Sequence, residues 1–212
     1  RLALNLTATG LEKSDIARGD WIVAEPAQAS TRRIDARIRL LRSEARDLAH
    51  WTPVHLHLGA SDVGARLVLL EGPTLAPGGS MRVQLELDRD ISAWHGDRFI
   101  LRDQSATRTL GGGQVIDPFA SATLRRKPLR LAALAAQELP APDQALQALL
   151  ALEQPAGVEI EPFLVARNLQ PAQRQALLQA VPHRAVPDGG GQRLFAPGQL
   201  ERVANSLTEA LA

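Results

Sequence analysis

The sequence predicts a mainly β region followed by an α-helical region that ends in a hairpin. From Arg33 to Pro118, apolar residues recur at every second position in several runs, with glycine and proline turns between them. This pattern indicates half-buried antiparallel strands, which close into a barrel or pack as a sandwich. After Pro118 the pattern changes to three short helices and a Gly-rich hairpin, an order that is typical of a winged helix.

The composition limits the classes of function that the chain can serve. The 212 residues suffice for one large or two small domains, and 24 basic against 23 acidic residues give a formal net charge of +1. Any polyanion contact must therefore come from local clusters of arginine. The absence of cysteine excludes disulfides and cysteine-based zinc sites. No apolar run approaches the roughly 18 residues of a membrane span, and no signal peptide opens the chain, so we expect a cytoplasmic protein without a membrane partner.

The first residues read as the end of a domain that begins upstream. The chain starts without Met, on the strand-like alternation Leu2–Leu6. The polar connection Glu12–Asp20 follows, in which Ile16 is expected to pack inward, and Pro26–Ser30 is a short linker. We therefore expect the chain to be a fragment or a processed product.

The period-2 pattern is clearest in three runs, and these should supply an aliphatic core because aromatic residues are only 3% of the chain. Turn signals separate them at Gly72-Pro73 and Pro77-Gly78-Gly79. The three runs are Ile34–Leu40, Val54–Leu58 and Met81–Leu87.

The stretch Gly96–Pro118 predicts two more strands, joined by the polar turn Asp103–Thr107. The second strand, Thr109–Ile116, contains Gly111-Gly112-Gly113. A glycine run inside a strand marks a bulge or the close approach of another backbone. The functional alternative is a bare backbone that is presented, with a basic loop, to a phosphate chain.

The helical region begins after a basic linker at Arg125–Pro128. Its predicted elements follow from caps, prolines and apolar stripes. They are an Ala- and Leu-rich stretch at Leu129–Leu139, a helix capped by Asp143 that runs through Glu153, helices that open near Pro162 and at Pro171, a hairpin at His183–Ala196, and an amphipathic helix at Leu200–Leu211.

His55 and His57 lie two residues apart, so both rings project from one face of a strand. This spacing suits a metal ion if a third ligand is added, and Asp62 and His95 are the nearby candidates. Solvated or interface histidines are the commoner case. We therefore expect no metal site.

No catalytic residue is predicted. Asp97, Asp103 and Asp117 flank the strands of Gly96–Pro118, and such residues cap turns more often than they form acid–base pairs. The chain has no nucleophile-elbow motif and no G-x-x-x-x-G-K-[ST] motif.

Arginines cluster in the second half of the β region. Arg98, Arg102 and Arg108 surround the predicted turn, with Arg82 and Arg89 upstream. A solvated barrel exterior explains such charges, and phosphate contact is the functional alternative. In the helical region, Arg174 is expected on the exposed side of the third helix, and Arg184 and Arg193 in the wing.

Several stretches resemble translational GTPases of the elongation factor Tu type. RLALNLTATGLEKSDIARGDWIVA at the start is similar to the end of their second domain, and RDQSATRTLGGGQVIDP to the end of their third. WTPVHLHLGASDVGARLVLL and the winged-helix tail are most similar to SelB, the selenocysteine-specific branch. The resemblance implies an elongation factor Tu-type antiparallel β-barrel followed by a winged-helix domain. It also implies these divisions: 1–29, the C-terminal part of barrel domain II; 30–118, barrel domain III; 119–142, a linker with a short helix; and 143–212, the first winged helix.

The resemblance further implies a part in delivering selenocysteinyl-tRNA to the ribosome at recoded UGA codons. This piece would contribute tRNA-binding barrel surface and the joint to an mRNA-reading arm. The mRNA hairpin would be bound by further winged helices. GTP and magnesium would belong to a GTPase domain outside this fragment, which itself needs no cofactor and is no enzyme.

Two sets of residues match functional positions of the family. Arg1 matches a basic residue of the selenocysteinyl pocket, where a guanidinium suits an ionised selenol. Where related factors have Thr in a tRNA-contacting loop, this chain has Gly64, so a hydroxyl contact is lost. The matches for the tRNA backbone are Arg89, Gln104 and Ser105, with Arg102 and Arg108 beside them.

Two other functions remain open from the sequence. A non-catalytic protein-interaction module agrees with the near-zero net charge, and scattered arginines would favour it over a single basic face. A DNA-binding regulator is the third alternative, although its presumed recognition helix Pro171–Val181 has Arg174 as its one basic residue.

Overall fold

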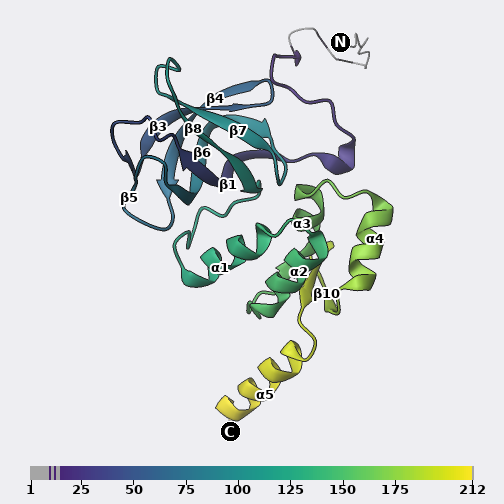
Figure 1. Ribbon diagram of the computed structural model, residues 1–212. Coiled ribbons are helices and arrows are strands. Elements are labelled where there is room, and N and C mark those ends of the chain that lie inside the picture. Colours follow the sequence, from purple (N-terminus) through teal and green to yellow (C-terminus); the bar gives the residue numbers. More distant parts are fainter. Residues whose placement is uncertain (1–9, 11, 13–14, 212) are drawn as a thin grey trace.

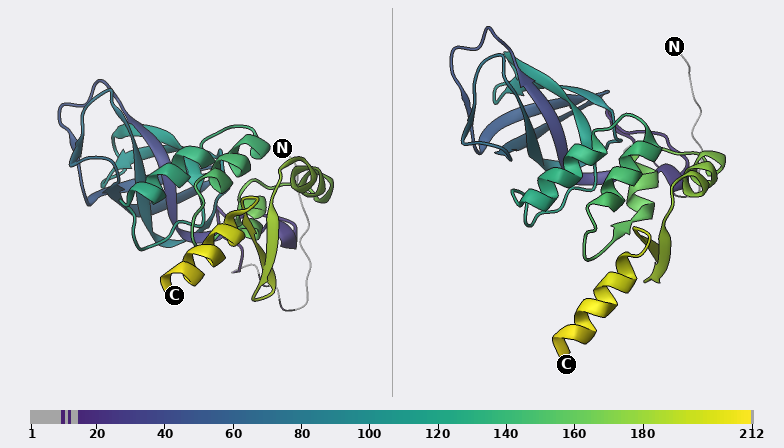
Figure 2. Two further views of the ribbon diagram at one scale, coloured as in Figure 1. Left: turned by 90° about the horizontal axis from the view of Figure 1, so that it is seen from below. Right: turned by 60° about the horizontal axis from the view of Figure 1, so that its bottom comes forward.

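The computed structural model describes residues 10, 12 and 15–211, in a β-barrel followed by a helical region (Figures 1 and 2). The predicted strand Leu2–Leu6 and Arg1 lie outside the described residues. Within the described part, no helix combines the length and the apolar character needed to cross a membrane.

Six antiparallel strands form the closed barrel, which settles the choice between barrel and sandwich in favour of the barrel. Their order around the barrel is β1-β6-β4-β3-β7-β8, and each strand pairs with both neighbours. A separate pair of short strands, β2 (Leu48–Ala49) and β5 (Thr74–Leu75), lies outside this ring. The barrel strands are β1 (Ser30–Leu40), β3 (Thr52–Leu58), β4 (Ser61–Leu69), β6 (Ser80–Ser92), β7 (Arg98–Asp103) and β8 (Thr109–Asp117).

The barrel core is aliphatic, as the composition predicts. Alternate residues of each strand point inward, and Phe99 is the one aromatic ring in this cluster of described residues. Strand β4 is not among the three runs that the alternation predicts. In that strand the alternation continues through Gly64, and the strand ends in the continuous apolar run Leu67–Leu69.

The glycines of β8 allow close approach of the neighbouring backbone. A Cβ on Gly111 would lie 2.2 Å from the Arg39 carbonyl oxygen, and one on Gly113 would lie 2.2 Å from that of Arg37. The register of β8 shifts against β7 at the edge of the run, between Gly111 and Thr109, and against β1 between Val115 and Asp117. The run is therefore a site of close backbone contact.

The segment before β1 differs from the sequence-based expectation. Ile16 is 45% exposed and does not pack inward. The expected linker begins within a short 3-10 helix, Glu25–Ala27. Trp21 contacts Trp94 edge-on with 5.3 Å between ring centroids, and Ser61 Oγ donates to the Gly19 carbonyl at 2.8 Å. These contacts hold residues 19–21 against one end of the barrel.

The helical region contains a winged helix, as predicted. Helices α2, α3 and α4 pack on a three-stranded sheet of order β10-β11-β9. Helix α5 projects away from it (Figure 1), and its residues 201–206 are exposed. The elements are α1 (Pro128–Gln137), α2 (Pro142–Ala151), β9 (Val158–Glu159), α3 (Ile160–Ala166), α4 (Pro171–Ala180), β10 (Arg184–Asp188), β11 (Gly191–Phe195) and α5 (Gln199–Leu211).

Two details of the helix predictions are wrong. Asp143 does not cap α2, because the helix starts one residue earlier with Pro142 at its first position and Ala141 as N-cap. Arg174 is expected on the exposed side of its helix, but its side chain is only 23% exposed on α4. Its Nε donates to the Leu169 carbonyl at 2.8 Å and its Nη1 pairs with Glu161 at 3.2 Å.

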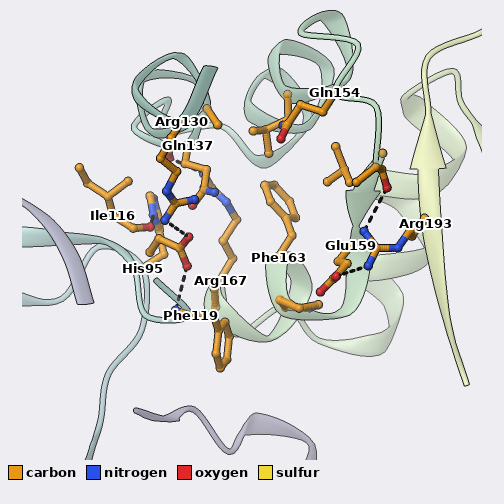
Figure 3. Close-up of a pocket in the computed structure, with 18 residues that line it drawn as sticks. His95, Ile116, Phe119, Arg130, Gln137, Gln154, Glu159, Phe163, Arg167 and Arg193 are labelled. Atoms are coloured by element: carbon orange, nitrogen blue, oxygen red, sulfur yellow. Dashed lines mark hydrogen bonds and ion pairs between the residues drawn. The ribbon is translucent and has the colours of Figure 1, made fainter. Parts of the chain in front are cut away.

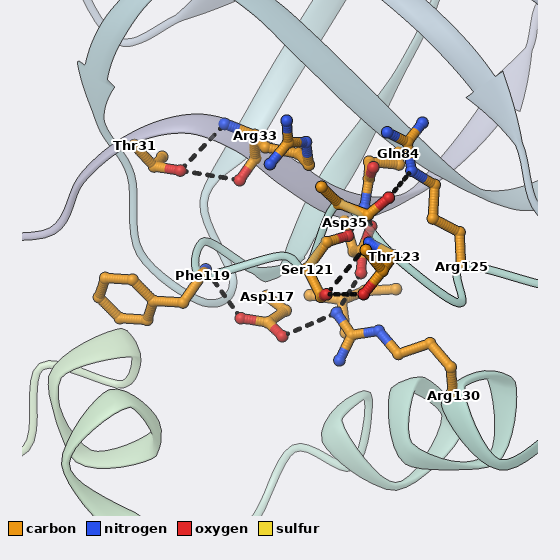
Figure 4. Close-up of polar contacts among 12 residues, drawn as sticks. Thr31, Arg33, Asp35, Gln84, Asp117, Phe119, Ser121, Thr123, Arg125 and Arg130 are labelled. Atoms are coloured by element: carbon orange, nitrogen blue, oxygen red, sulfur yellow. Dashed lines mark hydrogen bonds and ion pairs between the residues drawn. The ribbon is translucent and has the colours of Figure 1, made fainter.

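Helix α1 docks on the outer wall of the barrel. Leu134 is fully buried against Val68, Leu70 and Ile116. Beside this apolar contact, Arg130 Nη2 donates to both Asp35 and Asp117, the latter at 3.0 Å (Figure 4). Burial raises the pKa of Asp35, and the Arg130 charge opposes that rise.

A second cluster joins the end of α1 to the barrel, and we call it the Glu138 clamp. The Glu138 carboxylate accepts from Arg37 Nε at 2.5 Å and from Arg82 Nη2 at 2.7 Å. Burial by itself raises the pKa of Glu138, but the bonds from both guanidinium groups bring it below its usual value. On the winged-helix side, the backbone N–H of His95 donates to the Ala166 carbonyl at 2.7 Å.

Replacing Gly113 by Ala should destabilise the barrel strongly, because the new methyl group meets the Arg37 carbonyl. Overpacking of this kind costs about 1–3 kcal/mol or more. Gly191→Ala is the matched control, since its Cβ would meet nothing closer than 3.7 Å, and its effect should stay within about 0.5 kcal/mol. Urea unfolding measures both, and equal effects would contradict the role of close approach.

Replacing Glu138 by Gln should lower the free energy of unfolding by about 1–2 kcal/mol at neutral pH, because it removes the charged acceptor of two arginines. The folded-state pKa of Glu138 is depressed, so its contribution is present above the unfolded pKa of about 4.3 and disappears as the pH falls through the folded value. The two unfolding curves should therefore converge below about pH 4. A gap that persists in acid would exclude the carboxylate as its source.

Candidate nucleic-acid interface

One side of the barrel faces away from the helical region, and we call it the free face. It consists of the outward side chains of β3, β7 and the first part of β4, since Val68 near the end of β4 packs against α1. Strand β1 lies on the opposite wall beside α1 (Figure 1). The strand register places Gly64, His55 and Arg102 in one row, and Asp62, His57 and Ile100 in the next. The free-face residues are Asp62, Gly64, Arg66, Pro53, His55, His57, Arg98, Ile100 and Arg102.

The arginines of the free face have no acidic partner among the residues that the structure describes within 4 Å. Arg66 and Arg98 are exposed. Arg102 Nη2 donates to the Thr107 carbonyl at 3.2 Å, while its buried Nε has no partner. At the edge of the face, Arg89 Nη2 donates to the Asp62 carbonyl at 3.2 Å. These four cations therefore keep charge available for an anionic partner.

Asp62 lies between the two histidines. Its Oδ1 is 3.0 Å from His55 Nδ1 and 3.8 Å from His57 Nε2. The hydrogen bond with His55 lowers the pKa of Asp62, and the Arg102 charge adds to this. His95 lies elsewhere, bonded to the Ile116 carbonyl. The described residues contain no group of three or more His, Cys, Asp or Glu side chains that could hold a metal ion.

A shallow hollow of about 340 Å³ continues the free face toward the end of the barrel. Arg18 and Arg89 bring two cations to its wall, beside His57 and Asp62. The remaining lining residues are Gly59, Ala60 and Ser61. The hollow extends the basic surface beyond the strands.

The turn between β7 and β8 is organised by Asp103. Its Oδ1 accepts from the backbone N–H groups of Thr107 and Arg108, at 2.8 and 3.1 Å. These bonds, with that from Arg108 the strongest, lower the pKa of Asp103. The turn thereby holds Gln104 and Ser105 at the surface, where both are exposed.

The sequence-predicted residues separate into two groups. Arg102 lies on the free face and Arg89 at its edge, whereas Gln104 and Ser105 lie in the turn beyond β7. Arg108 is tied to Glu44 at 2.5 Å, although its side chain remains 57% exposed. Arg82 does not belong to this cluster, because it pairs with Glu71 and the Glu138 clamp.

The structure adds Arg66 to the predicted set. The alternation of Asp62, Gly64 and Arg66 against Val63, Ala65 and Leu67 is the sequence signal that identifies it. Gly64 lies under a neighbouring carboxylate, since a Cβ there would be 2.2 Å from Asp88 Oδ2. A larger side chain at Gly64 would displace Asp88.

The other aspartates that flank this region have separate structural partners. Asp97 Oδ2 accepts from the Trp94 backbone N–H at 2.9 Å, and burial raises the pKa of Asp97. Asp117 pairs with Arg130 and accepts from the Phe119 N–H. Asp97, Asp103 and Asp117 thus each bind a different set of partners.

Comparison with known proteins gives one consistent result. Residues 35–122 match the family described as selenocysteine-specific elongation factor, beta-barrel domain. The factor of that name from Escherichia coli K12 is 34% identical over 180 residues, covering 84% of this chain and 27% of the relative. That from Desulfomicrobium baculatum is 34% identical over 119 residues, covering 56% and 18%. The chain thus spans between 18% and 27% of the length of these relatives.

A solved structure has the same fold over most of the chain. It is a crystal structure of bacterial selenocysteine-specific elongation factor EF-Sec, with a TM-score of 0.62 and 16% sequence identity. The match covers 94% of this chain and 29% of that one. The barrel and the helical region therefore occur together in that fold.

Replacing His55 by Ala should raise the pKa of Asp62, because the hydrogen bond that lowers it most is lost. His57→Ala should raise it less, since His57 Nε2 lies 3.8 Å from the same oxygen and His55 Nδ1 lies 3.0 Å away. Carboxylate carbon chemical shifts measured against pH give both values. A larger rise in the His57 variant would contradict this geometry.

Proposed function

Because this chain belongs to the family of selenocysteine-specific elongation factors, we propose that it supplies a tRNA-binding barrel face and the joint to a winged-helix arm. The whole factor would deliver selenocysteinyl-tRNA to the ribosome at recoded UGA codons. GTP and magnesium would be bound by a GTPase domain outside these residues. The factor would act in the cytoplasm.

The observation that carries the proposal is the charge of the free face. Arg66, Arg98 and Arg102 stand there without an ion pair among the described residues, and Arg89 adds a fourth guanidinium at the edge. Two carboxylates lie on or over the same face, those of Asp62 and of Asp88 above Gly64. Arginines without an acidic partner can bind the phosphate oxygens of RNA. This binding releases the counterions that surround the RNA. The free face is also the side of the barrel that α1 leaves uncovered.

The remaining tRNA-binding residues are proposed to lie along the edge of the same surface. Gln104 and Ser105 would donate hydrogen bonds to the sugar–phosphate backbone from the turn that Asp103 holds. Arg108 would need to share its charge between Glu44 and a phosphate. For Arg1, outside the described residues, contact with the selenocysteinyl group remains a prediction.

The joint would set the direction in which the winged helix leaves the barrel. Arg130 and the Glu138 clamp hold α1 on the barrel wall, and α2 follows after a short connection. An mRNA hairpin bound by further winged helices would then keep a fixed orientation to the tRNA. No mRNA contact is assigned to this winged helix.

A protein-docking role is the alternative, and Ile100 favours it, because its side chain is 51% exposed in the middle of the free face. Salt dependence separates the two functions. Phosphate contacts weaken steeply as salt rises, whereas docking around an apolar residue does not.

Replacing Arg102 or Arg89 by Gln should weaken binding of this chain to selenocysteine tRNA and lower the salt-dependence slope by about one per arginine. Arg39→Gln is the matched control, because Arg39 is exposed on β1, across the barrel from β3. Filter binding over a range of salt concentrations, against bulk tRNA, measures both effects. Salt-independent binding, or equal losses in the Arg39 variant, would rule out the free face.

A further inference from the structure

A cleft of about 300 Å³ separates the barrel from the winged helix (Figure 3). The end of β8, helix α1 and helix α3 all contribute walls, and Arg167 of the α3 end extends along it. This volume is at the small end of the range for small-molecule sites. It is large enough for one compact group rather than for a folded segment.

Arg167 is the one arginine lining this cleft that lacks an acidic partner among the described residues. Arg130 is paired with Asp117, and Arg193 with Glu159. Arg167 lies over the Phe163 ring, with its Cζ 4.8 Å from the centroid. Burial lowers the pKa of Arg167 to about 10, so the side chain still carries its charge at neutral pH.

A structural role accounts for only part of the Arg167 guanidinium. Its Nη2 donates to the carbonyls of Gln137 and Leu139, at 2.7 and 3.3 Å, and so caps the end of α1. Nε and Nη1 make no hydrogen bond with the described residues. Neither of these two nitrogens is fully buried. Two nitrogens, which carry three N–H donors, and a full charge therefore remain available at the cleft, and an anion would bind them.

The other lining groups suit a base better than a peptide carboxylate. Phe119 lines the cleft and is 37% exposed, in a chain with few aromatic residues. An exposed ring of this kind offers a surface on which a nucleobase stacks. The side-chain amides of Gln137 and Gln154 also line the cleft, and amides both donate to and accept from base edges.

We propose that this cleft binds one nucleotide of a single-stranded RNA, with its phosphate on Arg167 and its base against Phe119. The site is separate from the free face and does not depend on the tRNA contacts proposed there. The two acids that line the cleft are each ion-paired, Asp117 with Arg130 and Glu159 with Arg193, which reduces their repulsion of a phosphate. Each of these arginines also pairs with a second carboxylate, Arg130 with Asp35 and Arg193 with Asp188.

The test uses the complete 212-residue chain and a fluorescently labelled single-stranded RNA trinucleotide, with anisotropy as the readout. Arg167→Gln should weaken binding by about tenfold or more, and Phe119→Leu by about fivefold or more, the loss expected for one stacked base. Arg184→Gln, an exposed arginine of the wing, should leave the affinity unchanged. If Arg167→Gln fails to fold in a urea titration, Arg167→Lys and Phe119→Leu carry the test.

His95 provides a second readout at the site. Its pKa is lowered by burial and by the Arg167 charge, so a bound phosphodiester should raise it. Proton NMR of the five histidines follows this shift in the presence of the trinucleotide. An unchanged His95 would place the RNA elsewhere and overturn the proposal.

Three further outcomes would also overturn it. One is full binding by both cleft variants, and another is loss of trinucleotide binding in Arg102→Gln, which would place the RNA on the free face. The third is that the cleft prefers another ligand to the trinucleotide. That ligand would be either an acidic peptide or inorganic phosphate, the latter with no effect of Phe119→Leu on binding. A negative result in this assay leaves the tRNA proposal standing, because that rests on Arg89 and Arg102.

Discussion

The contact of Arg130 with Asp35 and Asp117 is the constraint on which the arrangement of the molecule depends. Asp35 is 1% exposed on the outer side of a barrel strand, where a carboxylate would normally face water. An unpaired buried charge there would be strongly destabilising, so the barrel wall requires a cation from outside. Arg130 supplies it from α1, and Gln84 adds a hydrogen bond to Asp35 at 2.8 Å. The ion pairs of Arg130 and the apolar contact of Leu134 together determine where helix α1 lies.

Once α1 is fixed, the two sides of the barrel have different roles. On the β1 and β6 side most arginines are ion-paired, as Arg37 and Arg82 are in the Glu138 clamp. The β3, β4 and β7 side carries arginines that form no ion pair among the described residues. A net charge of +1 conceals this difference, because it averages a neutralised surface with a basic one. Local pairing therefore says more about partners here than total charge does.

Much of the fold follows from the sequence because its causes are local. Alternation identifies most barrel strands, and prolines mark the starts of α2 and α4. The sequence-based predictions are wrong where a contact with a distant or competing residue determines the local structure. Pro142 takes the first helical position and leaves Asp143 inside the helix, and Arg174 finds Glu161 on another helix. Most of the arginine pairing is invisible in the sequence, since Arg130 meets Asp35 across 95 positions. Arg102 was predictable from its strand, whereas the open donors of Arg167 required the assembled cleft.

The short path between the Glu138 clamp and α2 has a mechanical consequence. Only Leu139, Pro140 and Ala141 separate Glu138 from the first residue of α2. A pull on the winged helix would thus load the bonds from Arg37 and Arg82 almost at once, before the chain between the two regions could extend. The ion pairs of the clamp would break under less force at high ionic strength. Salt screens them because the side chains of Arg37 and Glu138 are more than one-fifth exposed to solvent. The tension that the arm can transmit to the barrel would then vary with the salt around it.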